Sequence, residues 1–168
     1  DRRSQTMSLL LTDSEIAGLL AERKPLPASF RSRLIPKPKK GHRERELPIP
    51  GVNGSSFLLI VRESLHNVLD FSAILAFLPA KTNQVFRLRR YNGKSHEHTN
   101  TLERQPPFYD FHIHVATERY QKAGLREDWF AEPSARFCDL QTALDCLIAD
   151  CSLSPADGER PDFFGMEQ

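Results

Sequence analysis

Apolar and polar positions alternate through the middle of the chain in short runs that are typical of β-strands. The runs are rich in β-branched and aromatic residues, and turn-forming residues separate them at regular intervals. They predict five strands, at residues 57–63, 68–77, 84–91, 95–103 and 108–115. Asn92-Gly93 lies between the third and fourth runs and favours a type I′ turn, in which both central residues need positive φ. We therefore expect an antiparallel β-meander of about five strands with a tight hairpin at Asn92-Gly93.

Helical periodicity flanks the strand region. Thr12 and Glu15 form a capping box ahead of an apolar stripe, which predicts a helix that begins after Thr12. A short helix is expected over residues 117–123, and a further helix begins after the cap residue Asp139. The pattern as a whole predicts an α+β fold in which helices pack on one face of the meander.

Proline and charge divide the chain into three parts. Six prolines fall from Pro25 to Pro50 among basic residues, and proline lacks the backbone donor that a helix or a central strand requires. We expect an N-terminal helix with a Pro/basic-rich arm in residues 1–50, an α+β core domain in residues 51–151, and an acidic, irregular tail in residues 152–168. The arm is either a solvated connector or a nucleic-acid-binding segment.

Composition bounds the class of protein. The chain has 168 residues, 39% hydrophobic and 27% charged, as in one ordinary soluble domain. No apolar run approaches the ~20 residues of a spanning helix, so a membrane span is not expected. The first residues carry no secretory signal, and the three cysteines match neither a zinc module nor a disulfide framework. These features predict a cytoplasmic protein with no membrane partner.

The net charge of +1 hides an asymmetry along the chain. Residues 23–45 contain nine Lys or Arg and one Glu, whereas residues 126–168 contain ten Asp or Glu and three Arg. The basic segment, with Lys37, Lys39 and Lys40, is a candidate for binding RNA or DNA. Association between the basic and acidic ends of two chains is an equally allowed use of this charge layout.

The candidate chemistry lies in the predicted strand 108–115. Its odd positions are apolar and are assigned to the core: Tyr109, Phe111, Ile113 and Val115. Its even positions are polar: Asp110, His112 and His114. Because side chains alternate between the two faces of a strand, the two imidazoles are expected in a row on the face opposite the core.

The predicted hairpin brings further residues to that face. A two-residue loop would pair Tyr91 with Lys94, Arg89 with His96, and Arg87 with His98. The candidate catalytic residues are His96, His98, His112, His114 and Asp110. The candidate nucleic-acid-binding residues are Arg87, Arg89, Tyr91, Lys94, Lys37, Lys39 and Lys40.

Three uses of this surface are open. Neutral and protonated histidines can act as base and acid in metal-independent RNA cleavage, with arginines on the phosphate and Asp110 orienting one imidazole. No cofactor is required, although paired His-x-His segments also have the ligand chemistry for a divalent metal ion. A register slip of one residue would instead pair Glu97 with the arginines and leave a solvated polar face.

Three segments from residue 86 onward can be compared with known families: FRLRRYNGKSHEHTNTLE, FYDFHIHVATERYQKAG and ARFCDLQTALDCLIADC. They resemble a family of small bacterial proteins without an established activity. The order of arginine-rich strand, Asn-Gly turn and histidine pairs is also loosely similar to the TumE-like toxins of bacterial toxin-antitoxin modules. That resemblance implies that the histidines at 96, 98, 112 and 114 match those of the toxin pattern, and it implies growth inhibition through RNA.

These observations favour a protein that binds or cleaves nucleic acid, most simply RNA, through an Arg/His sheet face, as a toxin or defence component. An antitoxin or another protein would then be a further partner. The alternative is a non-enzymatic protein-protein interaction module in which the charged arm and tail make the contacts.

Overall fold

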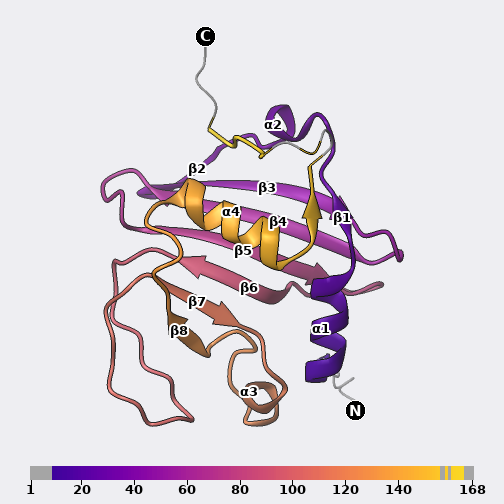
Figure 1. Cartoon of the computed structure of the whole chain (residues 1–168). Helices are drawn as coiled ribbons and strands as arrows, with labels where there is room; N and C mark the ends of the chain where they lie inside the picture. Colours follow the sequence, from indigo (N-terminus) through magenta and orange to yellow (C-terminus); the bar gives the residue numbers. More distant parts are fainter. Residues whose placement is uncertain (1–8, 156–157, 159, 165–168) are drawn as a thin grey trace, which may run out of the picture.

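The computed structural model describes residues 9–155, 158 and 160–164, and its main feature is a seven-stranded antiparallel sheet (Figure 1). The strands follow one another in chain order: β2 (Lys37–Lys39), β3 (His42–Pro50), β4 (Ser56–Ser64), β5 (Phe71–Leu78), β6 (Phe86–Asn92), β7 (His112–Val115) and β8 (Ala131–Pro133). A separate parallel pair joins β1 (Lys24–Pro25) to β9 (Leu153–Ser154). The predicted α+β meander is confirmed. Its strands differ from the five expected, because β2, β3 and β8 are additional and the expected strand at residues 95–103 is absent.

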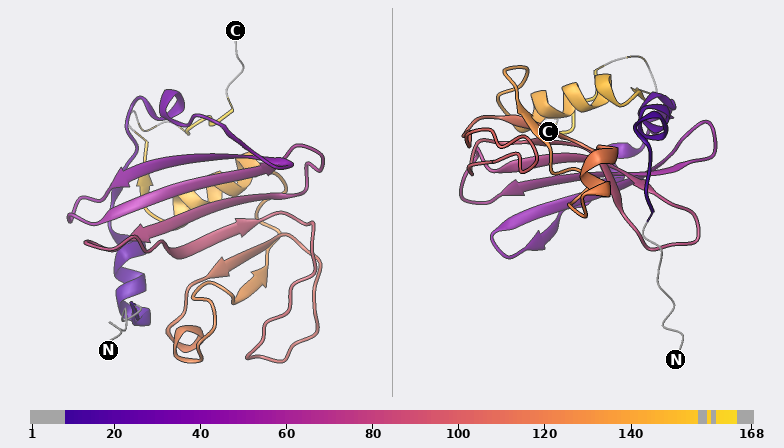
Figure 2. Two further views of the ribbon diagram at one scale, coloured as in Figure 1. Left: turned by 180° about the vertical axis from the view of Figure 1, so that it is seen from behind. Right: turned by 90° about the horizontal axis from the view of Figure 1, so that it is seen from below.

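The helices are α1 (Asp13–Ala21), α2 (Phe30–Arg33), α3 (Glu118–Lys122) and α4 (Leu140–Asp150). Thr12 caps α1 through the predicted capping box with Glu15, and Asp139 caps α4. α4 lies across one face of the sheet, and from behind the strands stand in front of it (Figure 2). None of the helices in the described ranges combines the length and the hydropathy that a membrane span requires.

The main core fills the space between α4 and the sheet. Leu47, Leu59 and Leu75 are register partners on β3, β4 and β5, and all three are fully buried. Opposed residues of antiparallel strands place their side chains on the same face, so these leucines form one apolar layer. Leu144 and Leu147 of α4 pack into the same core.

The expectation of a strandless arm in residues 25–50 is wrong. This segment supplies β2 and β3, so a boundary at residue 50 separates strands of one sheet. β2 pairs with β3 only up to Glu44, and beyond that point no strand in the described residues is hydrogen-bonded to the outer edge of β3. Pro48 and Pro50 therefore remove no ladder hydrogen bond, which is the physical reason that a proline-rich strand is tolerated here.

The tail is also less irregular than expected in its described part. Leu153 and Ser154 form β9, which lies beside β1 (Figure 1). Phe163 packs on the core with its ring centroid 5.2 Å from that of Phe30. Residues 156–157, 159 and 165–168, which belong to the predicted tail, lie outside the described residues.

The predicted hairpin at Asn92-Gly93 does not form. β7 pairs directly with β6, and residues 93–111 form a loop with a single bridge between His98 and Phe108. Gly93 does not adopt positive φ. A Cβ at that position would lie 2.0 Å from the carbonyl oxygen of Leu69, so the glycine is needed for a close approach of two backbones instead of a turn.

The alternation predicted for residues 108–115 holds in β7, but the exposures differ from expectation. Ile113 faces the core as the register partner of buried Tyr91, although it is itself only partly buried. Phe111 packs beside that core with intermediate exposure, and Tyr109 is exposed. The apolar face of this strand is thus only partly buried. The opposite face, which carries His112 and His114, is buried more completely.

Candidate functional site

Three buried histidines are in mutual contact on the sheet face opposite α4. The exposed fractions of His98, His112 and His114 are 6%, 5% and 2%. The ring centroid of His98 lies 5.6 Å from that of His112 and 4.8 Å from that of His114, and the other two are 4.9 Å apart. We call these three residues the histidine cluster.

Two different elements bring the cluster together. His112 and His114 alternate along β7, where they are the register partners of Asn92 and Arg90 on β6. His98 belongs to the 93–111 loop. Its backbone hydrogen bonds to Phe108 hold this loop folded back over the sheet. Three of the four histidines that sequence predicted thus meet, although the predicted hairpin is not what joins them.

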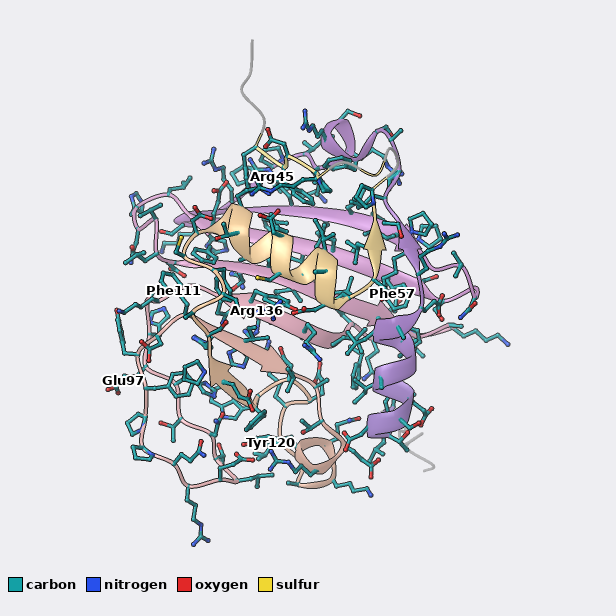
Figure 3. The ribbon with its side chains drawn as sticks, viewed as in Figure 1. Arg45, Phe57, Glu97, Phe111, Tyr120 and Arg136 are labelled. Atoms are coloured by element: carbon teal, nitrogen blue, oxygen red, sulfur yellow. The ribbon has the colours of Figure 1, made fainter. Side chains whose placement is uncertain are left out.

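The loop is anchored at its far end on α3. The Tyr120 hydroxyl donates to the Glu103 carboxylate at 2.5 Å, and the backbone N–H of Leu102 donates to the same hydroxyl. Tyr120 is fully buried, whereas Glu97, nearer the start of the loop, is exposed (Figure 3). The loop therefore covers the histidines as a fixed part of the fold, which explains their burial.

Each imidazole uses one ring nitrogen to bind an oxygen. His112 Nδ1 donates to the backbone carbonyl of Asp110 at 2.7 Å, and His114 Nδ1 donates to that of Asp128 at 2.9 Å. His98 Nε2 donates to the side-chain oxygen of Asn100 at 2.8 Å. In the neutral form, the second ring nitrogen of His112 and of His114 then carries a lone pair that can accept a proton.

Asn100 sets the orientation of His98. Its amide nitrogen donates to the Ala131 carbonyl at 2.8 Å, and its amide oxygen accepts from the Ala131 N–H at 2.9 Å. The oxygen therefore faces His98, which must present a donor to it. Sequence reasoning missed Asn100, although its spacing of two from His98 was a signal that both side chains share a face.

Burial lowers the pKa of all three histidines. It is the largest cause for His98 and His112, and it lowers the pKa of His114 to about 2 with a further contribution from the charge of Arg90. A lowered pKa keeps an imidazole neutral at pH 7. The free protein thus holds proton acceptors in the cluster, and the protonated partner of the expected acid–base pair is not favoured.

A buried carboxylate holds two arginines beside the cluster. Asp128 is fully buried, with Arg90 Nε at 3.2 Å and Arg126 Nε at 2.8 Å from its two oxygens. Two guanidinium groups share one carboxylate, so this group keeps a net positive charge. Arg90, Arg126 and Asp128 were not among the residues that sequence reasoning selected.

A pocket of about 500 Å³ opens onto the histidine cluster. The histidines form part of its lining together with basic and aromatic residues, including Lys40, His42, Arg62, Arg90, Arg126 and Trp129. Glu63, Asp70 and Glu97 are acidic residues in the same lining. Its volume lies in the ~300–1,000 Å³ range of pockets that hold small ligands.

A β-bulge decides which arginines reach this face. The register of β5 against β6 pairs Leu75 with Arg89 and Ala76 with Arg87, so Leu88 is one residue too many. The shift places Arg87 on the face of the histidine cluster, where it pairs with Glu127. Arg89 instead faces α4, so the prediction that it shares a face with Arg87 and the histidines is wrong.

Tyr91 is likewise on the covered face. It is fully buried, and its hydroxyl donates to Asp150 of α4 at 2.6 Å, so it is not available to nucleic acid. Asp110 contributes only its backbone carbonyl to His112, and its side chain is exposed. Within the described residues, its carboxylate does not form the expected hydrogen bond to an imidazole. His96 is exposed at the rim of the pocket, outside the histidine cluster.

The predicted lysines lie near the mouth. Lys37 and Lys39 are exposed on the edge strand β2, and Lys40 lines the pocket. Within the described part of the chain, none of these three lysines forms an ion pair. Lys94 is half-buried and does not belong to the pocket lining.

Among the residues that the structure describes, no group of three or more His, Cys, Asp or Glu side chains is arranged to hold a metal ion. The three imidazoles, although close together, are therefore not arranged as metal ligands.

Comparison with known proteins leaves the site to be interpreted on its own geometry. No protein-family model, curated protein or solved structure matches this chain.

Proposed function

We propose that this chain binds RNA in the pocket that opens onto the histidine cluster and cleaves it without a metal ion. The observation that carries the proposal is that neutral imidazoles and three arginines, Arg62, Arg90 and Arg126, line one pocket. Guanidinium groups match the geometry and charge of phosphate oxygens, and a neutral imidazole accepts a proton from a hydroxyl group. Both requirements of RNA phosphodiester transfer thus meet in one place.

The proposed reaction uses the RNA's own 2′-hydroxyl as nucleophile. A neutral imidazole accepts its proton while the 2′-oxygen forms a bond to phosphorus and the bond from phosphorus to the 5′-oxygen breaks. The imidazolium then returns the proton to the 5′-oxygen, so that the histidine is regenerated. Arginine side chains stabilise the negative charge that builds up on the phosphoryl oxygens.

His112 is the proposed general base. Its Nδ1–H is bonded to the Asp110 carbonyl, which leaves Nε2 as the acceptor. His114 is a poorer choice because a pKa of about 2 leaves little basicity. We assign His114 to packing and orientation beneath His112.

The pH dependence of RNA cleavage tests the proposal. Because burial lowers the pKa of His98 and His112 below the ordinary 6.5, the base stays neutral as the pH falls through that value. We expect kcat/KM for a fluorogenic RNA to be maintained from about pH 8 down to below about pH 6.5, with no loss in chelator. An acid limb near the ordinary histidine pKa, or loss of activity in chelator, would contradict the mechanism; the absence of RNA binding and cleavage would contradict the function.

A second test concerns the lysines of the β2–β3 hairpin. The arm cannot be deleted as a test, because it forms two strands of the sheet. A triple variant with Gln at Lys37, Lys39 and Lys40 is expected to weaken RNA binding at low salt and to reduce the slope of log affinity against log salt by up to about 2. Fluorescence anisotropy titrations at several salt concentrations measure this slope, and Lys81→Gln on the distant β5–β6 turn is the control. An unchanged slope in the triple variant would exclude these lysines from the RNA path.

A further inference from the structure

The floor of the pocket is a row of polar side chains that crosses four neighbouring strands. Arg62 of β4 is the register partner of Ser72 of β5, and Ser72 is that of Asn92 on β6. Asn92 is in turn the register partner of His112 on β7. Opposed residues of antiparallel strands lie on one face about 4.5–5.5 Å apart, so the row runs from a guanidinium to an imidazole.

Ser72 and Asn92, in the middle of this row, leave hydrogen-bond donors available to a ligand. The Ser72 hydroxyl donates to the side-chain oxygen of Asn92 at 2.8 Å, which fixes the amide. Within the described residues the amide nitrogen of Asn92 has no hydrogen-bond partner, and both residues line the pocket. The proposed cleavage step gives neither residue a role, although the amide offers two N–H donors to a bound group.

Trp129 provides an aromatic wall to the same pocket. Its indole N–H donates to the Thr99 carbonyl at 3.1 Å, and its ring centroid lies 4.9 Å from that of His98. The indole is half-buried and held in place at both of these contacts. A fixed, partly exposed aromatic ring in a basic pocket is the usual platform for an unstacked nucleobase.

We propose that the pocket seats one unpaired nucleotide of a single-stranded RNA, with its base against Trp129 and its edge on the amide of Asn92. This inference rests on the proposed function and gives it a substrate class. The bases of an RNA duplex are stacked and paired, and their edges face grooves that side chains read poorly. A base reaches a concave pocket only when it is single-stranded or turned out of the helix.

The test compares three RNA probes by fluorescence anisotropy: a short single strand, the same sequence as a duplex, and the same strand with abasic sites. We expect the single strand to bind more tightly than the other two. Trp129→Leu is expected to weaken binding of the single strand by about 5- to 150-fold, which corresponds to one lost base stack. The same variant is expected to leave binding of the abasic strand unchanged, and Trp129→Phe is expected to retain most of the affinity.

Asn92→Ala provides a second measurement that leaves the indole in place. It is expected to weaken binding of the single strand and to leave the abasic strand unaffected. Equal binding of the duplex, equal binding of the abasic strand, or full affinity in both variants would overturn the nucleotide seat while leaving RNA binding intact. Failure of all three RNA probes to bind at low salt would instead overturn the proposed function.

Discussion

Replacing Lys24 by Met is expected to lower the free energy of unfolding by about 3 to 5 kcal/mol. The Lys24 side chain is fully buried, and its ammonium group donates to backbone carbonyl oxygens at the ends of α1 and α4. The carbonyl oxygens of Leu19, Leu20, Glu22 and Cys151 lie 2.7, 3.1, 2.7 and 2.7 Å from Nζ, so the three N–H groups are shared among four acceptors. Met fills a similar volume but leaves these carbonyls without their donor, which costs about 1–3 kcal/mol for each one that water cannot reach.

Urea denaturation at pH 7 measures this loss. Lys37→Met on the exposed strand β2 makes the same chemical change without burial, and it is expected to alter the stability by less than about 0.5 kcal/mol. Burial lowers the pKa of Lys24 to about 8, so the ammonium form still predominates at the pH of the measurement. A Lys24→Met protein as stable as the parent would show that the ammonium group does not hold the two helix ends together.

Replacing His112 by Asn is expected to reduce RNA cleavage by about 10²- to 10⁴-fold, the usual effect of losing a general base. Asn places its amide nitrogen close to the position of Nδ1, so the bond to the Asp110 carbonyl can persist while the acceptor Nε2 is removed. Alanine is a poorer choice. His112 is 5% exposed, and truncation would leave a cavity in a covered site.

The matched control is His66→Asn, because His66 is exposed on the β4–β5 turn away from the histidine cluster. This variant is expected to cleave RNA like the parent. Thermal unfolding of both proteins checks that activities are compared between folded chains, and anisotropy checks that RNA still binds. Full cleavage by a folded His112→Asn protein would remove His112 from the mechanism and would favour the alternative of a non-enzymatic interaction module.

Local signals in the sequence predicted the features that depend on neighbouring residues. Thr12 and Asp139 cap their helices as expected, since a capping side chain binds a backbone N–H three residues away. The alternation that puts His112 and His114 on one face also holds, because it is a property of the strand itself. His112 and His114 were therefore identifiable as candidates before their contacts were known, whereas His98 was selected through a hairpin that does not form.

Wrong predictions arose where a residue pattern had two structural uses. The dipeptide Asn92-Gly93 is typical of a turn, yet Gly93 serves a close approach to Leu69. Prolines in residues 25–50 argued against strands, but Pro48 and Pro50 lie on a strand edge that has no hydrogen-bonded partner strand in the described residues. Neither distinction is visible in sequence, because it depends on which distant segment lies alongside.

The sequence by itself determined the α+β meander, the capped helices and the shared face of His112 and His114, because each follows from the periodicity of a single segment. Only the tertiary structure decided that Arg90 and not Arg89 meets the histidines, since one bulge opposite β5 changes the face of every later residue in β6. It also decided that the histidines are buried and neutral, because the 93–111 loop folds over them and removes water. Proton affinity depends on what covers a group, and that covering is a long-range property of the fold.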